Sequence, residues 1–356
     1  MPDELTPRKS ATLPDLSGMT HDELECFLEG RGQKKFRGSQ IMKWIHQGLV
    51  HSFEPMTNLS KSLREELAAS ADILCLKTVT TQTSSDNTTK FLFRLEDGLH
   101  IESVLIPEAD HDTLCVSTQV GCAMGCRICR TATMGFVRNL TAGEIVGQLL
   151  AIRRSRPESR ITNMVFMGMG EPLANFDNVV NSIRILTHPN GPQISWRRLT
   201  VSTSGLAPKI LELGSTVRAK LAVSLNAVTD EQRDYIMPVN KSYPLSKLIR
   251  ALQSYPLPRR DRITIEYVMI DRFNDSDSDA RQLVRLLNPL RVKINLIPFN
   301  DELSEEFRTP SPQRVARFQD ILMSKSVVAI IRKSRGRDIL AACGQLASGN
   351  KGAISE

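Results

Sequence analysis

Three cysteines lie within eight residues of one another, in the segment Gly121-Cys-Ala-Met-Gly-Cys-Arg-Ile-Cys129. Cys122, Cys126 and Cys129 form the spacing C-x3-C-x2-C. Soft thiolates bind iron–sulfur clusters, and three protein thiolates leave one iron of a 4Fe–4S cube without a protein ligand. An iron with an open position can bind a second molecule, as an open position on catalytic zinc does. The motif therefore predicts a cluster that does chemistry on a bound ligand.

Two other interpretations of these three cysteines are a zinc site with a distant fourth ligand and a chance grouping of buried thiols. Structural zinc sites usually pair two two-cysteine knuckles, and this sequence has no second knuckle. An odd total of seven cysteines argues against a structural disulfide framework. We favour the iron–sulfur interpretation. The four remaining cysteines are Cys26, Cys75, Cys115 and Cys343.

Composition and charge indicate a globular protein of the cytoplasm. The chain has 356 residues, 41% of them hydrophobic, which is enough for one large domain and a smaller one. No apolar run approaches the roughly 20 residues that span a bilayer, and the N-terminal segment lacks an apolar signal core. We therefore expect a cytoplasmic protein without a membrane partner. The net charge of +7 permits an anionic partner such as nucleic acid without identifying one.

The elements that must position the cysteines alternate between strands and helices. This alternation predicts an α/β fold with a parallel sheet, as a complete or partial barrel. Sites in such folds lie at the carboxyl ends of the strands, and the cysteine motif follows a predicted strand over 113–120. Strand-like runs begin near Thr113, Asn163, Arg198, Lys220, Arg262, Lys293 and Val327. Helical runs begin near Thr141, Asn175, Ala207, Leu245, Ser276 and Pro312.

Two segments precede the alternation. The first extends to about Ala71 and is predicted to form short helices, with a capping box over 20–23 and helical apolar spacing over 41–49. From Cys75 to Pro107 the pattern is strand-like. The helical segment interleaves basic and aromatic side chains, and both an ordinary solvated helix face and a small RNA-binding module fit this pattern. These side chains are Lys34, Lys35, Phe36, Arg37, Lys43 and Trp44.

Ten blocks, in order along the chain, resemble the RlmN/Cfr family of radical S-adenosylmethionine RNA methyltransferases, and the RlmN branch more closely. The blocks are GQKKFRGSQIMKWIH, IESVLIPE, LCVSTQVGCAMGCRIC, MGFVRNLTAGEI, VFMGMGEPL, LTVSTSG, LAVSLNA, IMPVNKSYPL, INLIPFN and RKSRGRDILAACGQL. The resemblance implies a partial (β/α)6 radical SAM barrel with a small N-terminal helical domain and a β-hairpin linker. It also implies methylation of carbon 2 of an adenine in 23S rRNA and, for many members, in tRNA.

On this basis we expect four units along the chain. They are an N-terminal helical RNA-binding domain over 1–75, a β-strand extension over 76–107, a radical SAM core with a catalytic C-terminal segment over 108–346, and a flexible tail over 347–356.

The resemblance also implies which residues bind the cofactors. Cys122, Cys126 and Cys129 match the ligands of a 4Fe–4S cluster. Gly170 and Glu171 match the pair that holds the methionine end of S-adenosylmethionine, where a carboxylate can meet the ammonium group. The further cofactor contacts match Ser202, Ser224, Leu225, Asn226 and Asn300. The asparagine at 226 departs from the family pattern, in which many members carry histidine, and its amide still offers a donor and an acceptor.

Three more residues match catalytic positions of the family. Cys343 matches the cysteine that becomes S-methylated, Cys115 matches the thiol that forms a transient disulfide with it, and Glu102 matches the proton acceptor. Without the resemblance, Cys115 would be a small strand hydrophobe and Cys343 a buried helix-end thiol. Glu102 would be a solvated carboxylate. Cys26 and Cys75 match nothing.

In the scheme that the resemblance implies, the Cys343 thiolate takes a methyl group from one S-adenosylmethionine. A second S-adenosylmethionine binds the open iron and yields a 5′-deoxyadenosyl radical, which removes hydrogen from the S-methyl group. The carbon radical adds to adenine, Glu102 accepts the ring proton, and Cys115 attacks the Cys343 sulfur to release the product. We therefore expect one cluster per chain, two S-adenosylmethionine molecules per turnover, an external electron donor and a monomeric enzyme.

RNA fits this chemistry, because a target base must be unstacked to reach the centre of a barrel. Lys333, Arg335 and Arg337, near Cys343, offer phosphate contacts. Three alternatives stay open: Cfr-like methylation at carbon 8 of the same adenine, a radical enzyme that acts on a small molecule, and a non-catalytic iron–sulfur protein that binds RNA or transfers electrons.

Overall fold

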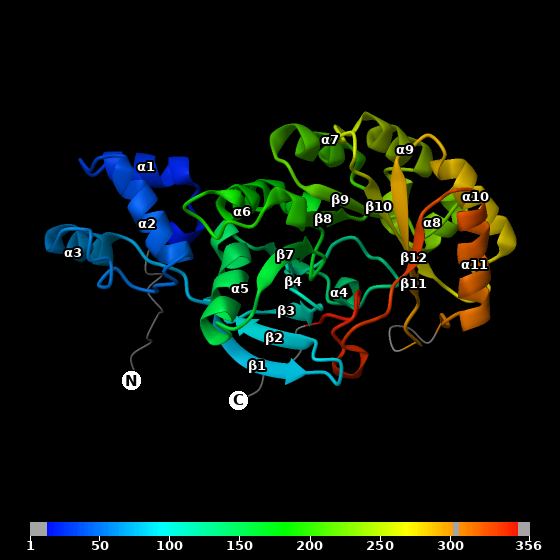
Figure 1. Ribbon diagram of the computed structural model, residues 1–356, viewed down its shortest axis with the longest axis horizontal. Coiled ribbons are helices and arrows are strands. Elements are labelled where there is room, and N and C mark those ends of the chain that lie inside the picture. Colours follow the sequence, from blue (N-terminus) through cyan, green and yellow to red (C-terminus); the bar gives the residue numbers. More distant parts are fainter. Residues whose placement is uncertain (1–12, 302–305, 348–356) are drawn as a thin grey trace, which may run out of the picture.

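The computed structural model describes residues 13–301 and 306–347, which form an α/β protein (Figure 1). The main sheet has ten strands in the order β1-β2-β3-β4-β7-β8-β9-β10-β11-β12. The strands from β4 onward are parallel, and β1 to β3 extend the sheet with antiparallel pairs. The strands are β1 Lys77–Thr83, β2 Thr89–Arg94, β3 His100–Pro107, β4 Asp112–Cys115, β7 Ile161–Phe166, β8 Leu199–Thr203, β9 Lys220–Ser224, β10 Ile263–Met269, β11 Val292–Pro298 and β12 Ala329–Ile331.

Helices follow the parallel strands and cover the outer face of the sheet (Figure 1). Their starts agree with the predicted ones because local signals specify them: Thr141 and Ser276 close capping boxes, and Pro312 stands in the first turn of its helix. The sheet ends at β1 and β12 without closing, so the predicted partial barrel is confirmed. The helices are α5 Ala142–Ser155, α6 Phe176–Thr187, α7 Ala207–Thr216, α9 Leu245–Ser254, α10 Asp277–Leu287 and α11 Pro312–Ser324.

The strand register gives the sheet an inner face whose side chains are polar and half-exposed. Ser202 pairs with Ala222, and Ser224 pairs with Glu266, which in turn pairs with Asn295. Paired residues of neighbouring strands share one face of a sheet, so the polar side chains of this group all face the interior of the barrel. The alternate residues are buried apolar side chains under the helices, among them Val201, Val223, Ile265 and Leu296.

The strand expected over 113–120 is broken in two, which corrects the prediction. Strand β4 ends at Cys115, and a separate short strand β5 (Gln119–Gly121) pairs with β6 (Phe136–Asn139) in a two-stranded sheet. The break arises because the chain leaves the main ladder: the N–H groups of Thr118 and Gln119 both donate to the carbonyl of Met169, at 2.8 and 3.2 Å. The cysteine motif therefore follows β5 and lies beyond the carboxyl end of β4.

Three N-terminal helices pack beside the barrel (Figure 1). The Gln47 side chain donates to the carbonyls of Pro189 and Gly191, both at 3.0 Å, in the loop that precedes β8. Arg154, in the last turn of α5, donates to the carbonyls of residues 49–50, at 2.8 and 3.1 Å. The helical unit is thus attached near the amino ends of the parallel strands. Its helices are α1 His21–Glu29, α2 Phe36–His46 and α3 Lys61–Ser70.

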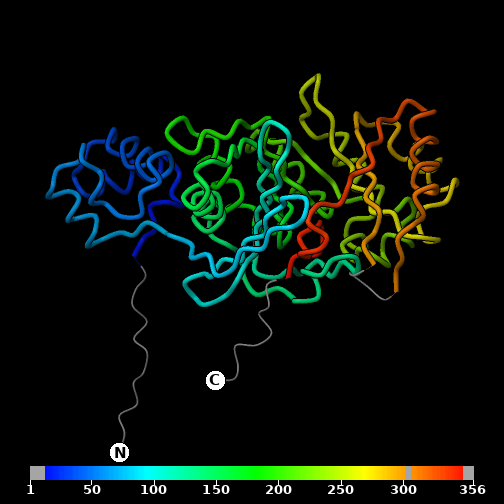
Figure 2. Tube along the Cα trace, turned by 60° about the horizontal axis from the view of Figure 1, so that its bottom comes forward, coloured from blue at the N-terminus to red at the C-terminus, as the bar shows by residue number. Residues whose placement is uncertain are grey.

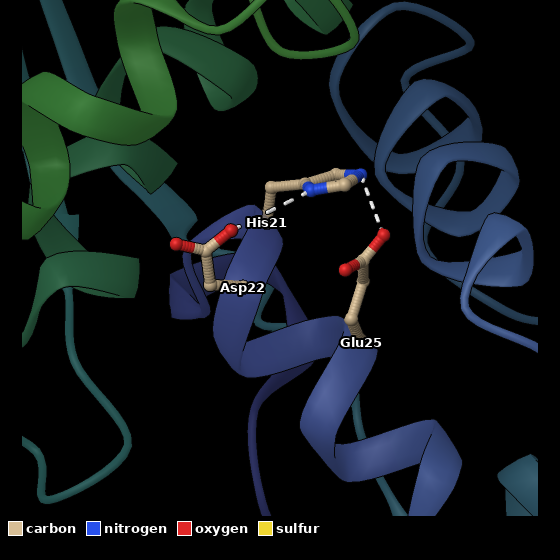
Figure 3. A group of neighbouring side chains, drawn as sticks. All are labelled: His21, Asp22 and Glu25. Atoms are coloured by element: carbon tan, nitrogen blue, oxygen red, sulfur yellow. Dashed lines mark ion pairs between the residues drawn. The ribbon is translucent and has the colours of Figure 1, made fainter.

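One cluster of polar side chains on α1 resembles a metal site and has a structural explanation. His21, Asp22 and Glu25 place their donor atoms within 4.8 Å of one another (Figure 3). The two ring nitrogens of His21 face different carboxylates, Nδ1 toward Asp22 at 3.9 Å and Nε2 toward Glu25 at 3.7 Å. Nε2 also lies 2.8 Å from Ser39 Oγ, and the ring stacks on His188 at the end of α6. The cluster therefore joins the N-terminal helices to the barrel.

No helix within the described ranges is long and apolar enough to span a membrane. Residues 348–356, most of the tail expected over 347–356, lie outside the described part of the chain.

Candidate active site

The three cysteines of the motif lie on a loop that is held at both ends. Gly121 has φ of 72°, a conformation that favours glycine, and a side chain there would collide with the backbone of Gly135. The N–H of Cys122 donates to the carbonyl of Gly135 at 2.9 Å, and the N–H of Arg127 donates to the carbonyl of Ile236 at 3.0 Å. We call residues 122–129 the cluster loop.

The thiols of the cluster loop are close enough to shift one another's pKa values. Burial raises the pKa of Cys122 to about 11, and the neighbouring Cys129 thiol contributes. Burial, Cys129 and Cys122 also raise the pKa of Cys126. Thiols with raised pKa values become thiolates only when a positive centre binds them, as a metal does. A metal-binding role therefore suits this environment.

The spacing of the three thiols favours a cluster over a single ion. Thiolates on one tetrahedral zinc ion lie about 3.8 Å apart, given Zn–S bonds of about 2.3 Å. Within the described ranges, the cluster-loop thiols do not form a group whose donor atoms all lie within 4.8 Å. Thiolates of a 4Fe–4S cube bind different irons and lie farther apart. The loop thus fits the predicted cluster, and a single zinc ion fits it less well.

Glu171 is a buried carboxylate beside these thiols. It is 4% exposed, and it contributes to the raised pKa values of Cys122 and Cys126, which places it near both. Its two oxygens accept from the N–H groups of Ser204, at 2.7 Å, and Leu173, at 3.1 Å. Burial raises the pKa of Glu171 itself, so an ammonium group beside it would be stabilised strongly.

Gly170 lets the chain pass close to the strand that leads into the cluster loop. It has φ of 99°, and a Cβ atom there would lie 2.5 Å from the Cβ of Gln119. The Gln119 side chain accepts from the N–H of Glu171 at 2.8 Å. The GMGEP turn is therefore packed against β5, with its carboxylate directed toward the thiols.

The other predicted cofactor contacts lie at or near the carboxyl ends of β8, β9 and β11. They differ in exposure and in the hydrogen bonds that they already make. Ser202 and Ser224 face the half-open inner surface. Leu225 is fully buried, and its N–H donates to the carbonyl of Glu266 at 3.0 Å. Asn226, with φ of 58°, already accepts from the N–H of Val268 at 2.9 Å. The asparagine at 300 accepts from Arg337 at 3.2 Å.

Arg233 links the carboxyl ends of β8 and β9 through hydrogen bonds. It belongs to α8 (Asp230–Ile236) and is fully buried. Its guanidinium donates to the carbonyls of Ser204, Ser224 and Leu225, at 2.5, 3.2 and 3.0 Å, and to Asn240 at 2.9 Å. Burial lowers its pKa to about 10, so the group stays charged at neutral pH. One side chain thus fixes the ends of β8 and β9.

Replacing Arg233 with methionine should lower the free energy of unfolding by more than about 3 kcal/mol, because it leaves several buried carbonyls without a donor. Urea denaturation of the purified protein measures this change. Arg233→Lys keeps the charge and part of the hydrogen bonding, so its loss should be smaller. A matched Arg153→Met control removes only two longer hydrogen bonds, at 3.3 and 3.4 Å, from a half-buried site. Equal stability of Arg233→Met and the wild type would show that Arg233 does not hold the strand ends.

The C-terminal segment brings Cys343 to the cluster loop. The N–H of Arg130 donates to the carbonyl of Gly344 at 2.7 Å, and Thr131 Oγ1 donates to the carbonyl of Leu346 at 2.7 Å. In Figure 2 this red segment runs beside the cyan strands, where Asp338 accepts from Ser84 Oγ at 2.5 Å. The segment is therefore clamped between α4 (Arg130–Thr133), which directly follows the cluster loop, and the turn that joins β1 to β2.

Cys115 and Cys343, which the sequence separates widely, are neighbours in the structure. Burial raises the pKa of the Cys115 thiol, and Cys343 adds to the effect. Burial also raises the pKa of Cys343; Glu266 and Cys129 add to the increase, and Arg332 opposes it. Cys343 is accessible to solvent. Both thiols are free.

Glu102 lies within β3 and is 5% exposed, so the interpretation as a solvated carboxylate is wrong. Its carboxylate lies 3.2 Å from Lys90 Nζ and accepts from the N–H of Ala347 at 2.9 Å. Glu102 and Lys90 line a cavity of about 260 Å³ on the β1–β3 strands. Through Val104, which pairs with Cys115, the register places Glu102 and Cys115 on the same face of the sheet.

Sequence reasoning missed Lys90, Arg233 and Glu266. The alternation of residues 90–95 predicted a strand in which Lys90 shares a face with every second residue, but it assigned Lys90 no role. No local pattern distinguished Arg233 or Glu266 from other charged residues. Two of the three basic residues predicted as phosphate contacts interact with other side chains of the protein. Arg337 donates to the side chain of residue 300, and Arg335 lies 3.9 Å from Asp86.

Comparisons with known proteins agree with this geometry. Residues 14–73 match a family model described as the ribosomal RNA large subunit methyltransferase N-terminal domain, and residues 116–287 match the radical SAM superfamily. A solved radical SAM methyltransferase from Sphaerobacter thermophilus superposes with a TM-score of 0.88 at 44% identity, over 94% of this chain and 99% of that one.

Curated relatives are similar over nearly the whole chain. The dual-specificity RNA methyltransferase RlmN of Geotalea uraniireducens is 52% identical over 93% of this chain and 96% of its own length. The RlmN of Syntrophotalea carbinolica is 53% identical over 93% of this chain and 89% of its own. With the cluster loop, the buried Glu171 and the two neighbouring thiols already in place, these similarities establish that the chain belongs to the RlmN family of radical SAM RNA methyltransferases.

Proposed function

We propose that this protein methylates carbon 2 of an adenine in 23S rRNA and in tRNA, using Cys343 as the carrier of the methyl-derived carbon. The relatives named dual-specificity RNA methyltransferase RlmN support this activity. The observation that carries the proposal is the meeting of Cys343 with Cys115 and the cluster loop. A second candidate, methylation at carbon 8, has no observation of its own in its favour.

The residues fit the two groups that the family requires. Cys122, Cys126 and Cys129 would hold the 4Fe–4S cluster, and Glu171 would face the ammonium group of S-adenosylmethionine. When bound, these two groups supply a 5′-deoxyadenosyl radical that removes hydrogen from a methylated Cys343. The clamp on the C-terminal segment holds the Cys343 sulfur at the cluster loop, so the carbon that it carries stays within reach of the cofactor.

Release of the product uses two further groups of this chain. Glu102, ion-paired with Lys90, accepts the ring proton of the joined adenine. The unpaired electron of the radical adduct must leave as well, and the oxidised cluster would be its acceptor when bound. The Cys115 thiolate then attacks the Cys343 sulfur: an S–S bond forms, the S–C bond breaks, and its electron pair leaves with the carbon, which takes a proton to become methyl. An external electron donor must reduce the disulfide and the cluster before the next turnover.

The decisive experiment is methylation of defined rRNA and tRNA fragments by the reconstituted enzyme. Mass spectrometry of the digested nucleosides should show 2-methyladenosine from both substrates. A methyl group at carbon 8, or the absence of methylated adenosine from every fragment, would refute the assignment.

Four finer points belong to the same proposal. The helical unit over 1–75 binds RNA, the strands over 76–107 extend the sheet that carries Glu102, and the core over 108–346 holds the cofactors. The enzyme works as a monomer. It receives electrons from a separate carrier. Because ribosomal and transfer RNA are its substrates, it acts in the cytoplasm.

Replacing Cys115 with alanine should trap the covalent adduct. The variant can still carry the methyl group on Cys343 and join it to adenine, but it lacks the thiol that breaks the S–C bond. Purified variant should carry RNA joined through Cys343, visible on a denaturing gel as a shift that nuclease removes. Cys26→Ala, which changes an exposed thiol on α1, should show no such shift. Full multiple-turnover activity of Cys115→Ala without trapped RNA would rule out this role.

A further inference from the structure

The ion pair between Lys90 and Glu102 is the most deeply buried one in the described part of the chain. Its side chains are 11% and 7% exposed, and Lys90 Nζ lies 3.2 Å from one oxygen of the Glu102 carboxylate. The next most buried pair, Arg138 with Glu144, has side chains that are 31% and 10% exposed. A buried charge is strongly disfavoured without its partner, so each charge of the Lys90–Glu102 pair depends on the other.

The strand register brings the two side chains together. Lys90 pairs with Val104, and Leu92 pairs with Glu102, so Lys90 and Glu102 are diagonal neighbours on one face of the sheet. Within the described ranges, Lys90 is the only basic group at ion-pair distance from Glu102. The other titratable groups that the strands place on this face are Lys77, Arg94, His100 and Cys115.

The remaining neighbours of this face are uncharged or contact other groups. Strand β1 contributes the neutral side chains of residues 80 and 82. On the C-terminal segment, Cys343 lies beside Cys115. The charged side chains Arg335, Arg337 and Asp338 of that segment contact Asp86, residue 300 and Ser84 instead. Lys90 is therefore the group that compensates the charge of Glu102.

Each oxygen of the Glu102 carboxylate has one partner. One faces Lys90, and the other accepts from the N–H of Ala347 at 2.9 Å. The C-terminal segment is also anchored to the turn before β2, where Asp338 accepts from a serine hydroxyl at 2.5 Å. Cys343 lies on the segment between these two anchors. The carboxylate is thus held beside the segment that carries the reactive sulfur, and each oxygen keeps a lone pair that can accept a proton.

A carboxyl group can accept the ring proton only while it is ionised. Burial favours the neutral acid, and a nearby positive charge favours the carboxylate. Lys90 supplies that charge from 3.2 Å. As an ammonium group, Lys90 has no lone pair and cannot take the proton itself. The two side chains therefore have separate tasks, since Lys90 maintains the charge and Glu102 accepts the proton.

A cavity of about 260 Å³ adjoins the pair. Thr80, Gln82 and Leu92 complete its lining. The side chains of Thr80 and Gln82 are exposed, because β1 is an edge strand of the main sheet (Figure 1). The cavity is therefore open to solvent on the side of β1.

We propose that Lys90 is the positioning residue of the proton transfer: it keeps the buried Glu102 carboxylate ionised and directed at the C-terminal segment. This inference rests on the proposed function, in which Glu102 accepts the ring proton, and adds a second residue to that step. The C–H bond of the ring breaks, its electron pair stays with the ring, and its proton binds a Glu102 oxygen. The proton then passes to solvent through the cavity, which restores the ion pair with Lys90.

The test compares Lys90→Met, which removes the charge, with Lys90→Arg, which keeps it. Lys209→Met is the matched control, because it breaks an exposed ion pair on α7, in which Lys209 lies 2.6 Å from Glu212. Each protein is reconstituted with its cluster. The rate of 2-methyladenosine formation on a tRNA fragment is measured between about pH 6 and 9. Cluster content and S-methylation of Cys343 are recorded for each protein.

Lys90→Met should form 2-methyladenosine about 100-fold more slowly at neutral pH, because a general base contributes at least about that factor. Its cluster and its S-methylation of Cys343 should match the wild type, and RNA joined to Cys343 should accumulate. The ratio of its rate to the wild-type rate should rise with pH, because a higher pH ionises the unpaired carboxyl group again. Lys90→Arg should recover most of the rate, and Lys209→Met should match the wild type throughout.

A double variant separates this role from packing. If Lys90 acts through Glu102, adding Lys90→Met to Glu102→Gln should lower the rate no further than Glu102→Gln alone. The double variant also carries no unpaired buried charge, so it keeps the test possible if Lys90→Met alone fails to fold. A further loss of rate in the double variant would show that Lys90 acts independently of Glu102 and would overturn the inference.

A wild-type rate and pH profile for Lys90→Met would also overturn the inference and leave the proposed function standing. So would a slow Lys90→Met protein that traps no RNA and whose ratio to the wild type is the same at every pH, because a structural role predicts that result. Failure of the wild-type protein to methylate any RNA would instead refute the proposed function.

Discussion

Replacing Cys126 with alanine is expected to abolish the cluster and reduce cleavage of S-adenosylmethionine to background. Cys126 is the middle thiol of the cluster loop, and Cys122 and Cys129 alone would hold only two irons of the cube. The loop cannot rearrange to place another ligand at the position of Cys126, because backbone hydrogen bonds at Cys122 and Arg127 hold it in place. The expected results are loss of the brown colour, iron content near zero after reconstitution, and no 5′-deoxyadenosine.

Cys75→Ala is the matched control, since Cys75 is an exposed free thiol outside the loop. It should reconstitute with the same iron content as the wild type. If Cys126→Ala kept a full 4Fe–4S spectrum and normal turnover, Cys126 would not be a ligand.

Replacing Cys343 with alanine should leave the cluster intact and eliminate methylated RNA. The contacts that clamp the C-terminal segment come from the backbone of Gly344, Leu346 and Ala347, so they survive the loss of the sulfur atom. The variant should therefore reconstitute normally and still cleave S-adenosylmethionine. It has no sulfur to carry the methyl group, so 2-methyladenosine should fall by at least about a thousandfold, to the detection limit of nucleoside mass spectrometry.

Intact-protein mass spectrometry provides a second measurement. Wild-type protein treated with S-adenosylmethionine should gain one methyl group on Cys343, and the variant should gain none. Cys26→Ala should behave as the wild type in both assays. Substantial methylation of RNA by Cys343→Ala would mean that the carbon travels by another route.

Local patterns in the sequence were sufficient for the cofactor and for the order of elements. The spacing of Cys122, Cys126 and Cys129 is a property of eight residues and needs no tertiary information. The starts of α5 and α10 were predictable because capping at Thr141 and Ser276 involves side chains three residues apart. The parallel sheet followed from alternating strands and helices, since each periodicity reports which side chains are buried.

The tertiary structure decided which distant groups meet. Glu102 and Lys90 face one another only because β2 and β3 pair in a register that puts Glu102 opposite Leu92, two residues from Lys90. Cys343 reaches Cys115 because the C-terminal segment crosses from the β1–β2 turn to the cluster loop. The sequence resemblance matched these residues to roles without placing them.

The broken strand over 113–120 shows the same limit. Its residues from Leu114 to Val120 are buried, and their local pattern does not reveal that the Met169 carbonyl accepts hydrogen bonds from Thr118 and Gln119, where the chain leaves the main sheet. Arg233 is a further case. A buried arginine looks like an exposed one in a sequence, and only the folded chain shows that it links the ends of β8 and β9. Local periodicity reports burial, whereas strand register and docking of distant segments depend on contacts that no short segment contains.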